Sequence, residues 1–376
     1  MRIRWLAAAA ALVVAFSVAS PVPATAAPRW EMTEIPDTTY PTWMNDVVAL
    51  PSGDAWAAGM HIREGGLFVP TVYATVVWRW DGTRWNDVSP YSVTASEHVS
   101  AITGSSGNDI WVMGRSGDNG SSEADGVAHH WDGQAWTTMT IPRDQGKPVV
   151  PNDATMVGGE VWAVGFVELA FLDTRAAVVR WNGSSWSKMD VPLPAGDSVL
   201  YGVRAAGPND VWAVGWTKAR TSGAFTQPFV VHWDGTRWSR VPTPTSASDV
   251  SLSDVEIRGP GEVWVAGSEK WMNQNPPPGP ERPFVLRWNG QSWTRTPTPT
   301  GQYRTYLSTL GLRDGQLWAG GISTATVLTW NGQTWQVGPT PPGTYLSVTA
   351  LAGGPNGTLW ATGDSSGEMY LARLVG

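Results

Sequence analysis

A Trp-x-x-Gly element recurs seven times, a second tryptophan element alternates with it, and no segment shows the 3.6-residue apolar period of a helix. Together these features predict an all-β fold, a seven-bladed β-propeller of four-stranded antiparallel blades. The repeat is about fifty residues long. A single sheet of that size cannot bury both of its faces, whereas a closed ring of such sheets can.

The spacing of the two elements shows which part of each repeat is constant. The first element has its tryptophan at Trp56, Trp111, Trp162, Trp212, Trp264, Trp318 and Trp360. The second, Trp-[Asp/Asn]-Gly-x-x-Trp, begins at Trp80, Trp131, Trp181, Trp233, Trp288 and Trp330. The distance from the second element to the next Trp-x-x-Gly is 30 or 31 residues, but in the other direction it ranges from 12 to 24. One connection in each repeat is therefore free to vary.

The fourth repeat shows how one blade is divided into strands. Four segments rich in Val, Trp, Phe and Thr follow one another: LYGVRAAG, DVWAVGW, PFVVHWDG and TRWSRVPTP. These residue types favour strands, and the Asp-Gly between the last two provides the backbone conformation of a tight hairpin. Each repeat is therefore predicted to form a four-stranded meander.

The two ends of the chain predict how the ring closes. The final segment YLARLVG aligns with FVVHWDG so that Gly376 falls on Gly235, which leaves the last repeat without a fourth strand. The segment RWEMTEIP aligns with RWSRVPTP and places Trp30 on Trp238. We expect the N-terminal segment to supply the outer strand of the last blade.

Residues 1–26 have the pattern of a secretory signal peptide. Arg2 and Arg4 precede an apolar run, and small residues follow before Ala26. We expect this segment to be removed, leaving residues 27–376 as a single propeller domain that is secreted into the extracellular space. No later segment approaches the roughly 20 apolar residues of a membrane-spanning helix, so we expect no membrane insertion.

The charge and the cysteine content exclude several classes of function. The chain has 25 basic and 32 acidic side chains, a formal net charge of -7, which does not suit a nucleic-acid partner. It has no cysteine, which rules out disulfides and a copper radical oxidase of the galactose-oxidase kind. The histidines show no metal-ligand spacing: His61, His98, His129, His130 and His232. We expect a monomer with no metal and no cofactor.

Most of the 25 tryptophans occupy positions that recur in the repeat. Besides the two elements, the outer strands carry Trp30, Trp85, Trp136, Trp186, Trp238, Trp293 and Trp335. A buried tryptophan removes roughly 150–250 Å² from water, so these rings are predicted to hold the blades together rather than to bind a ligand.

The repeats after residue 28 resemble those of secreted bacterial repeat propellers, of the kelch-like, tryptophan-rich seven-bladed kind. The Trp-Asp-Gly-x-x-Trp hairpin is also similar to the Asp-box of sialidase propellers and to the tryptophan-docking motif of quinone-dependent dehydrogenases. The first resemblance implies a non-enzymatic propeller. The arginine cluster of a sialidase is not apparent, because Arg204 and Arg258 do not occupy matching positions in their repeats.

The variable connection and the loop entering the next blade are expected on one face of the ring. Loops on a rigid scaffold commonly carry binding sites. The candidate ligand-binding residues are aromatic residues near these loops: Trp43, Trp216, Trp271, Tyr40, Tyr303, Tyr306 and Tyr345. We place Trp43 just before an inner strand. These rings either stack on a ligand or cover the blade tops.

The leading hypothesis is a secreted, non-catalytic module that recognises carbohydrate or another cell-surface polymer through this variable face. A protein-interaction scaffold in an extracellular assembly is the first alternative. The second is a polysaccharide hydrolase or lyase, because carboxylates from different blades can converge unseen in the sequence. Its acidic candidates are Asp173, Glu269 and Glu281.

Overall fold

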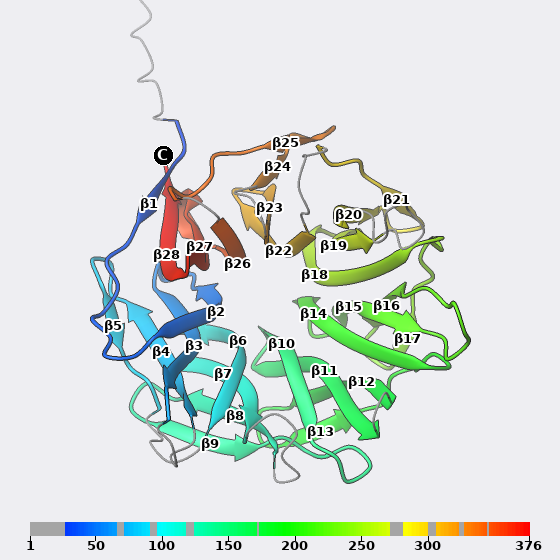
Figure 1. Ribbon diagram of the computed structural model, residues 1–376, viewed down its shortest axis with the longest axis horizontal. Coiled ribbons are helices and arrows are strands. Elements are labelled where there is room, and N and C mark those ends of the chain that lie inside the picture. The colour runs from blue at the N-terminus through cyan, green and yellow to red at the C-terminus, as the bar shows by residue number, and fades with distance from the viewer. Residues whose placement is uncertain are drawn as a thin grey trace, which may run out of the picture.

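The computed structural model describes residues 27–65, 71–90, 96–117, 124–170, 173–270, 281–299, 306–322, 327–343 and 346–376. The expected signal peptide, residues 1–26, lies outside this part of the chain. Seven four-stranded antiparallel sheets form a ring around a central axis (Figure 1), as the sequence predicted. No helix in the described ranges is long and apolar enough to cross a membrane.

The strands occupy four positions in each blade, from the axis outward. The inner strands are β2 (Thr42–Ala49), β6 (Glu97–Ser106), β10 (Val149–Val157), β14 (Asp197–Gly207), β18 (Asp249–Gly259), β22 (Tyr306–Arg313) and β26 (Leu346–Gly353). The second strands are β3 (Ala55–Arg63), β7 (Asp109–Ser116), β11 (Glu160–Ala170), β15 (Asp210–Lys218), β19 (Glu262–Lys270), β23 (Gln316–Ile322) and β27 (Leu359–Ser365).

The third strands are β4 (Val72–Trp80), β8 (Gly126–Trp131), β12 (Asp173–Trp181), β16 (Gln227–Trp233), β20 (Glu281–Trp288), β24 (Leu328–Trp330) and β28 (Glu368–Val375). The outer strands are β5 (Trp85–Asp87), β9 (Trp136–Thr140), β13 (Trp186–Met189), β17 (Trp238–Arg240), β21 (Trp293–Arg295), β25 (Trp335–Val337) and β1 (Arg29–Met32). The 3₁₀ turn η1 (Pro355–Gly357) joins β26 to β27.

The ring closes through its N-terminal strand. The seventh sheet has the order β1-β28-β27-β26, and Trp30 pairs with Leu374 (Figure 1). This is the register that the alignment of Trp30 with Trp238 predicts, because Trp238 pairs with Trp233 in blade four. The indole of Trp30 also donates to the Pro339 carbonyl at 2.8 Å, which ties the closing strand to blade six.

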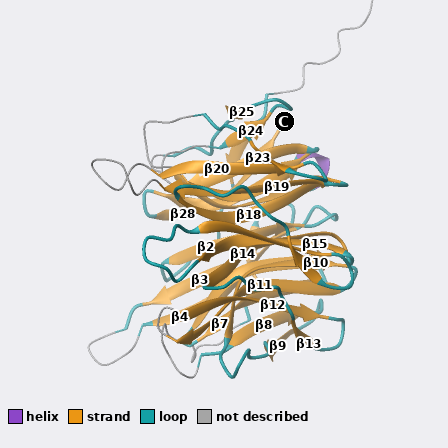
Figure 2. Cartoon of the chain, turned by 90° about the vertical axis from the view of Figure 1, so that its right-hand side faces the viewer, coloured by secondary structure: helices purple, strands orange, loops and turns teal. Residues whose placement is uncertain are grey.

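The antiparallel order gives the disc two distinct faces, seen edge-on in Figure 2. We call the loop face the one on which the inner strands begin. It carries the connections between second and third strands and those between blades. The turn face carries the short turns, including η1, which lies toward the right of Figure 2.

The repeat tryptophans are buried or half-buried between blades, as expected. The Trp-x-x-Gly ring of one blade contacts the paired hairpin rings of the next: Trp264 lies 4.8 Å from Trp330 and 5.8 Å from Trp335, measured between centroids. The seventh interface repeats this arrangement, because Trp360 lies 5.3 Å from Trp80 and 5.2 Å from Trp85. These aromatic clusters hold neighbouring blades together all around the closed ring.

An acidic residue and a basic residue hold many of these rings in place. In blade two the Trp111 indole donates to Asp109, and His130 stacks on Trp111 while its Nε2 lies 2.9 Å from Asp109. His232, Trp212 and Asp210 repeat the arrangement in blade four. These two histidines therefore have a structural role.

Candidate functional site

Every inner strand has a β-bulge at a corresponding place, two to four residues after the strand begins. The bulged residues are Asn45, Ser100, Asn152, Tyr201, Ser253, Ser308 and Thr349. A bulge bends its strand and redirects a side chain. All seven residues, which we call the bulge ring, line a cavity of about 160 Å³ in the central channel.

Five members of the bulge ring donate a hydrogen bond to a backbone carbonyl of the following blade. Asn45 donates to Val99, and the other four bonds are Ser100 to Pro151, Asn152 to Leu200, Ser308 to Val348 and Thr349 to Met44. Tyr201 and Ser253, in the adjacent blades four and five, have no such bond to another described residue. The bulge ring thus repeats the same inter-blade hydrogen bond in every blade except the adjacent blades four and five.

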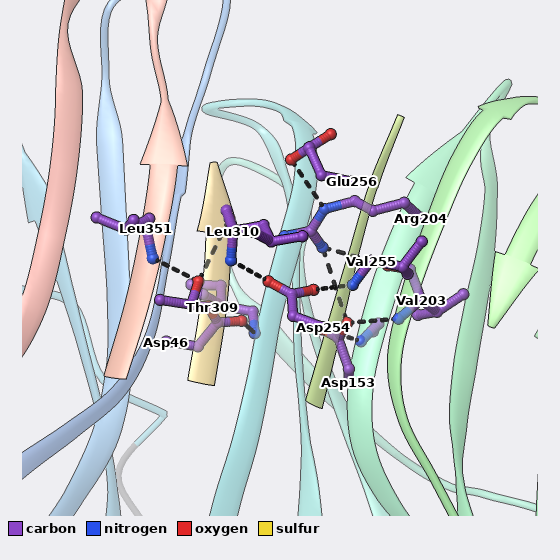
Figure 3. A network of polar contacts seen from close by, with 12 residues as sticks. Asp46, Asp153, Val203, Arg204, Asp254, Val255, Glu256, Thr309, Leu310 and Leu351 are labelled. Atoms are coloured by element: carbon purple, nitrogen blue, oxygen red, sulfur yellow. Dashed lines mark hydrogen bonds and ion pairs between the residues drawn. The ribbon is translucent and has the colours of Figure 1, made fainter. Parts of the chain in front are cut away.

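Three aspartates beside the bulges join blades one to two, three to four and five to six. Asp254 accepts from its own neighbour Val255 at 2.7 Å and from Leu310 of the next blade at 2.7 Å (Figure 3). Asp46 accepts from the N–H of the residue after it and from Ile102 of the next blade. Asp153 accepts from the N–H of the residue after it and from Val203 of the next blade. The inner strands are the edges of their sheets, and the carboxylates satisfy N–H groups that no further strand pairs.

One arginine lies among these carboxylates. Arg204 Nη1 lies 3.7 Å from Asp153 Oδ2, and its Nε lies 3.7 Å from Glu256 Oε2 (Figure 3). We call Arg204, Asp46, Asp153, Asp254 and Glu256 the Arg204 cluster. It has a single cation for four carboxyl groups.

Burial and crowding raise the pKa values of these carboxyl groups. Burial raises the pKa of Asp46 to about 6 and the pKa values of Asp153 and Glu256 to about 7, although Arg204 opposes the shift. The pKa of Asp254 is raised for the same reason. Burial alone would lower the pKa of Arg204, but the surrounding carboxylates raise it. The carboxyl groups of the cluster are therefore partly protonated near neutral pH, while the arginine stays charged.

The Arg204 cluster lies between two cavities of the channel. The bulge-ring cavity lies on the side of the loop face, and a second cavity of about 260 Å³ lies toward the turn face. Arg204 and Asp46 line both. Ligand pockets for drug-sized molecules usually exceed about 300 Å³, so either chamber suits only a small group.

The cluster predicts an unusual pH dependence of stability. Unfolded Asp and Glu titrate near pH 4, below the folded pKa values of about 6 to 7. A raised folded pKa gives stability that is present at low pH and lost as the pH rises through the folded value. We expect the free energy of unfolding to be about 2 kcal/mol larger at pH 5 than at pH 8. Thermal melts across this range test it, and Glu256→Gln should flatten the profile.

Two of the sequence-predicted ligand residues are exposed on the loop face. Tyr40 and Trp43 are each 40% exposed, and Trp43 is the one exposed tryptophan among those that the structure describes. Trp43 lies inside β2 rather than just before it, because β2 already begins at Thr42. The strand therefore fixes this ring more firmly than a loop would.

Polar side chains lie around Tyr40, whereas Trp43, which follows Thr42 in β2, points to the other face of the sheet. The guanidinium of Arg63 lies 5.6 Å from the centre of the Tyr40 ring. Thr42 donates to the Tyr40 carbonyl at 3.0 Å, and its hydroxyl lies 2.7 Å from His61 Nδ1. We call these five residues, Tyr40, Thr42, Trp43, His61 and Arg63, the blade-one platform.

The other sequence candidates are placed differently. Trp216 is half-buried near the end of β15 in blade four, and Tyr306 is half-buried at the start of β22 in blade six. Trp271, Tyr303 and Tyr345 lie outside the described residues. Of the seven aromatic candidates, Tyr40 and Trp43 are thus the two that are exposed among the described residues.

Two of the three acidic candidates for catalysis, Asp173 and Glu269, lie in ion pairs with arginines. Arg220 binds Asp173 and lowers its pKa. Burial alone would raise the pKa of Glu269, but hydrogen bonds from Arg295 and Ser248 lower it. Glu281 lies on β20, half-buried. A general acid needs a raised pKa, so the environments of Asp173 and Glu269 do not suit that role.

The sequence-based prediction did not include Tyr201 or the Arg204 cluster. Tyr201 is 38% exposed in the channel. Its signal is present in the sequence, because the matching residues of the other repeats are small Asn, Ser and Thr. Among the described residues, no three His, Asp or Glu side chains are placed to hold a metal ion.

Known structures share the fold. YCF48 bound to a D1 peptide is 16% identical, with a TM-score of 0.58 over 94% of this chain and 99% of that one. An inactive virginiamycin B lyase from Staphylococcus aureus with quinupristin is 13% identical, with a TM-score of 0.59 over 92% and 99%. No protein-family model and no curated protein matches the chain. At these identities the likeness establishes the class, a seven-bladed β-propeller, and nothing finer.

Proposed function

We propose that the chain is an exported, non-catalytic binding protein that recognises a carbohydrate or another cell-surface polymer on its loop face. The observation that carries the proposal is the blade-one platform, where Tyr40 and Trp43 expose two aromatic rings at the start of β2, and hydroxyl, imidazole and guanidinium groups lie beside Tyr40. Aromatic faces stack on sugar rings, and the neighbouring polar groups can bond to sugar hydroxyls. Export is proposed from the signal-peptide pattern of residues 1–26.

The burial pattern supports a ligand rather than a packing role for Trp43. The other tryptophans within the described ranges are buried or half-buried, and those of the two repeated elements fill the interfaces between blades. Trp43 does not belong to either repeated element. A large exposed ring held by a strand is already ordered before binding, so little conformational entropy is lost on contact with a ligand.

The structural neighbours are compatible with more than one use of the fold. YCF48 was solved with a bound peptide, and virginiamycin B lyase is named as an enzyme. The lowered pKa values of Asp173 and Glu269 argue against these two residues as general acids. The carboxyl groups of the Arg204 cluster, whose pKa values are raised, contact backbone N–H groups and Arg204. We therefore propose a binding role.

Sedimentation with insoluble cellulose, chitin and peptidoglycan sacculi, together with a glycan array, tests this function. We expect residues 27–376 to bind at least one of these probes. Trp43→Ala should weaken that binding about tenfold, since one stacked ring contributes on the order of 1.4 kcal/mol.

Met32→Ala is the matched control, because Met32 is 45% exposed but lies on the outer strand β1. Its binding should equal that of the wild type. If no glycan binds while a single protein co-purifies from culture supernatant in stoichiometric amount, the protein-scaffold alternative replaces the proposal.

A further inference from the structure

We propose that the bulge-ring cavity binds the terminal sugar of the polymer, so that the protein recognises chain ends rather than chain interiors. This inference rests on the carbohydrate-binding function proposed above. It starts from the one irregularity of the bulge ring, at Tyr201 and Ser253.

The two irregular residues are free to bind a ligand. Their five counterparts use their side chains as donors to the neighbouring blade. Tyr201 instead stays 38% exposed in the cavity, and no described residue bonds to its hydroxyl or to that of Ser253. Blades four and five therefore offer an aromatic face and two hydroxyl groups that the fold itself does not use.

The backbone of blade four makes room for this arrangement. A Cβ on Gly202 would lie 2.8 Å from the Cα of Asp254 and 3.0 Å from the Ser253 carbonyl oxygen. Only glycine lets β14 approach β18 so closely while the preceding tyrosine reaches into the channel. Tyr201, Gly202 and Ser253 thus form one local departure from the repeat.

The size of the cavity fits one sugar. Its volume of about 160 Å³ lies below the roughly 300–1,000 Å³ of typical pockets for drug-sized ligands, which favours a single sugar ring over an oligosaccharide. The remaining ring members can still accept hydrogen bonds, because a donating hydroxyl or amide keeps its oxygen lone pairs. Uncharged polar groups around an aromatic face match the hydroxyls and C–H face of a sugar.

The floor of the cavity determines that only an end can enter. The Arg204 cluster lies between this cavity and the one toward the turn face, and in the proposed binding mode the sugar enters from the loop face with the cluster beneath it. An internal sugar is linked on both sides and needs two exits, whereas a terminal sugar needs one. The floor also selects against acidic sugars, because its single arginine is already surrounded by four carboxyl groups.

End-blocked oligosaccharides test the inference. The glycan class selected by the array is prepared as a hexasaccharide in three forms. One is unmodified, one has its reducing end opened to the alditol with borohydride, and one has its non-reducing end capped with a 4,6-O-ethylidene group. Affinity is measured by calorimetry with wild type, Tyr201→Ala and Tyr201→Phe.

We expect one of the two blocks to weaken binding at least tenfold and the other to have no effect. Tyr201→Ala should weaken binding of the unmodified form about tenfold, and Tyr201→Phe by threefold or less, because it keeps the ring. Melting temperatures near that of the wild type show that the variants fold.

Equal affinity for all three forms, or wild-type affinity in Tyr201→Ala, overturns the chain-end inference and leaves the proposed function standing. Absence of binding to every glycan of the array overturns the proposed function itself. The two failures are therefore distinguishable.

Discussion

Arg204→Met is expected to lower the free energy of unfolding by about 3 kcal/mol at pH 8. The substitution keeps an apolar stem of similar length but removes the cation that lies 3.7 Å from both Asp153 and Glu256. Four crowded carboxyl groups then remain without a positive partner, and leaving buried charges unpaired is costly. The loss is measured by urea denaturation.

The same variant should recover much of its stability at pH 5. Protonation removes the uncompensated charges, since the carboxyl pKa values, already about 6 to 7 beside the arginine, rise further without it. Arg258→Met is the control, because Arg258 lies on the turn face with a 3.4 Å contact to Glu262 and outside the cluster. A pH-independent loss in Arg204→Met would contradict the electrostatic account of the channel.

Trp264→Ala is expected to destabilise the fold by about 4 kcal/mol. Trp264 is fully buried between blades five and six, where it contacts Trp330 and Trp335 and donates to Glu262 at 3.1 Å. Its removal opens a cavity that the rigid sheets cannot close, so the lost burial is not recovered.

The same measurement on Trp43→Ala gives the comparison with an exposed tryptophan. Because that ring is 40% exposed, its loss should change the free energy of unfolding by about 0.5 kcal/mol or less. Equal destabilisation in the two variants would refute the division between structural and ligand-binding tryptophans.

The sequence predicted the fold down to the register of its closing strand. Repeated tryptophans mark the same strand in every blade, and a fixed spacing of 30 or 31 residues leaves little freedom in where the inner strand lies. The alignment of Trp30 with Trp238 succeeded because the last blade must satisfy the same hairpin contacts as the others. Repetition thus converts one local pattern into a complete topology.

The side chains that line the channel were not predicted, for a physical reason. A β-bulge depends on backbone register, and none of the bulged residues has a side chain that requires one. The convergence of Asp46, Asp153 and Arg204 needs the ring geometry, because they come from different blades. Only Tyr201 left a trace in the sequence, as a large residue among small ones. Sequence comparison within one chain finds shared positions more readily than exceptions to them.

The exceptions to the sevenfold pattern are where we place the function. Trp43 and Tyr40 form an exposed surface at blade one, and Tyr201 and Ser253 interrupt the bulge ring at blades four and five. The repeated residues join blades to one another, as the repeat tryptophans and five members of the bulge ring do. Evolution of a propeller can change such exceptions without losing the ring, since loops and channel residues contribute less to packing than the interfaces do.

The affinity of the double variant Trp43→Ala/Tyr201→Ala for the glycan selected by the array tests this claim most directly. The account predicts a loss of roughly 100-fold, two stacked rings at about 1.4 kcal/mol each, with a melting temperature close to that of the wild type. Wild-type affinity in the folded double variant would contradict it, and the site would then have to lie elsewhere on the ring.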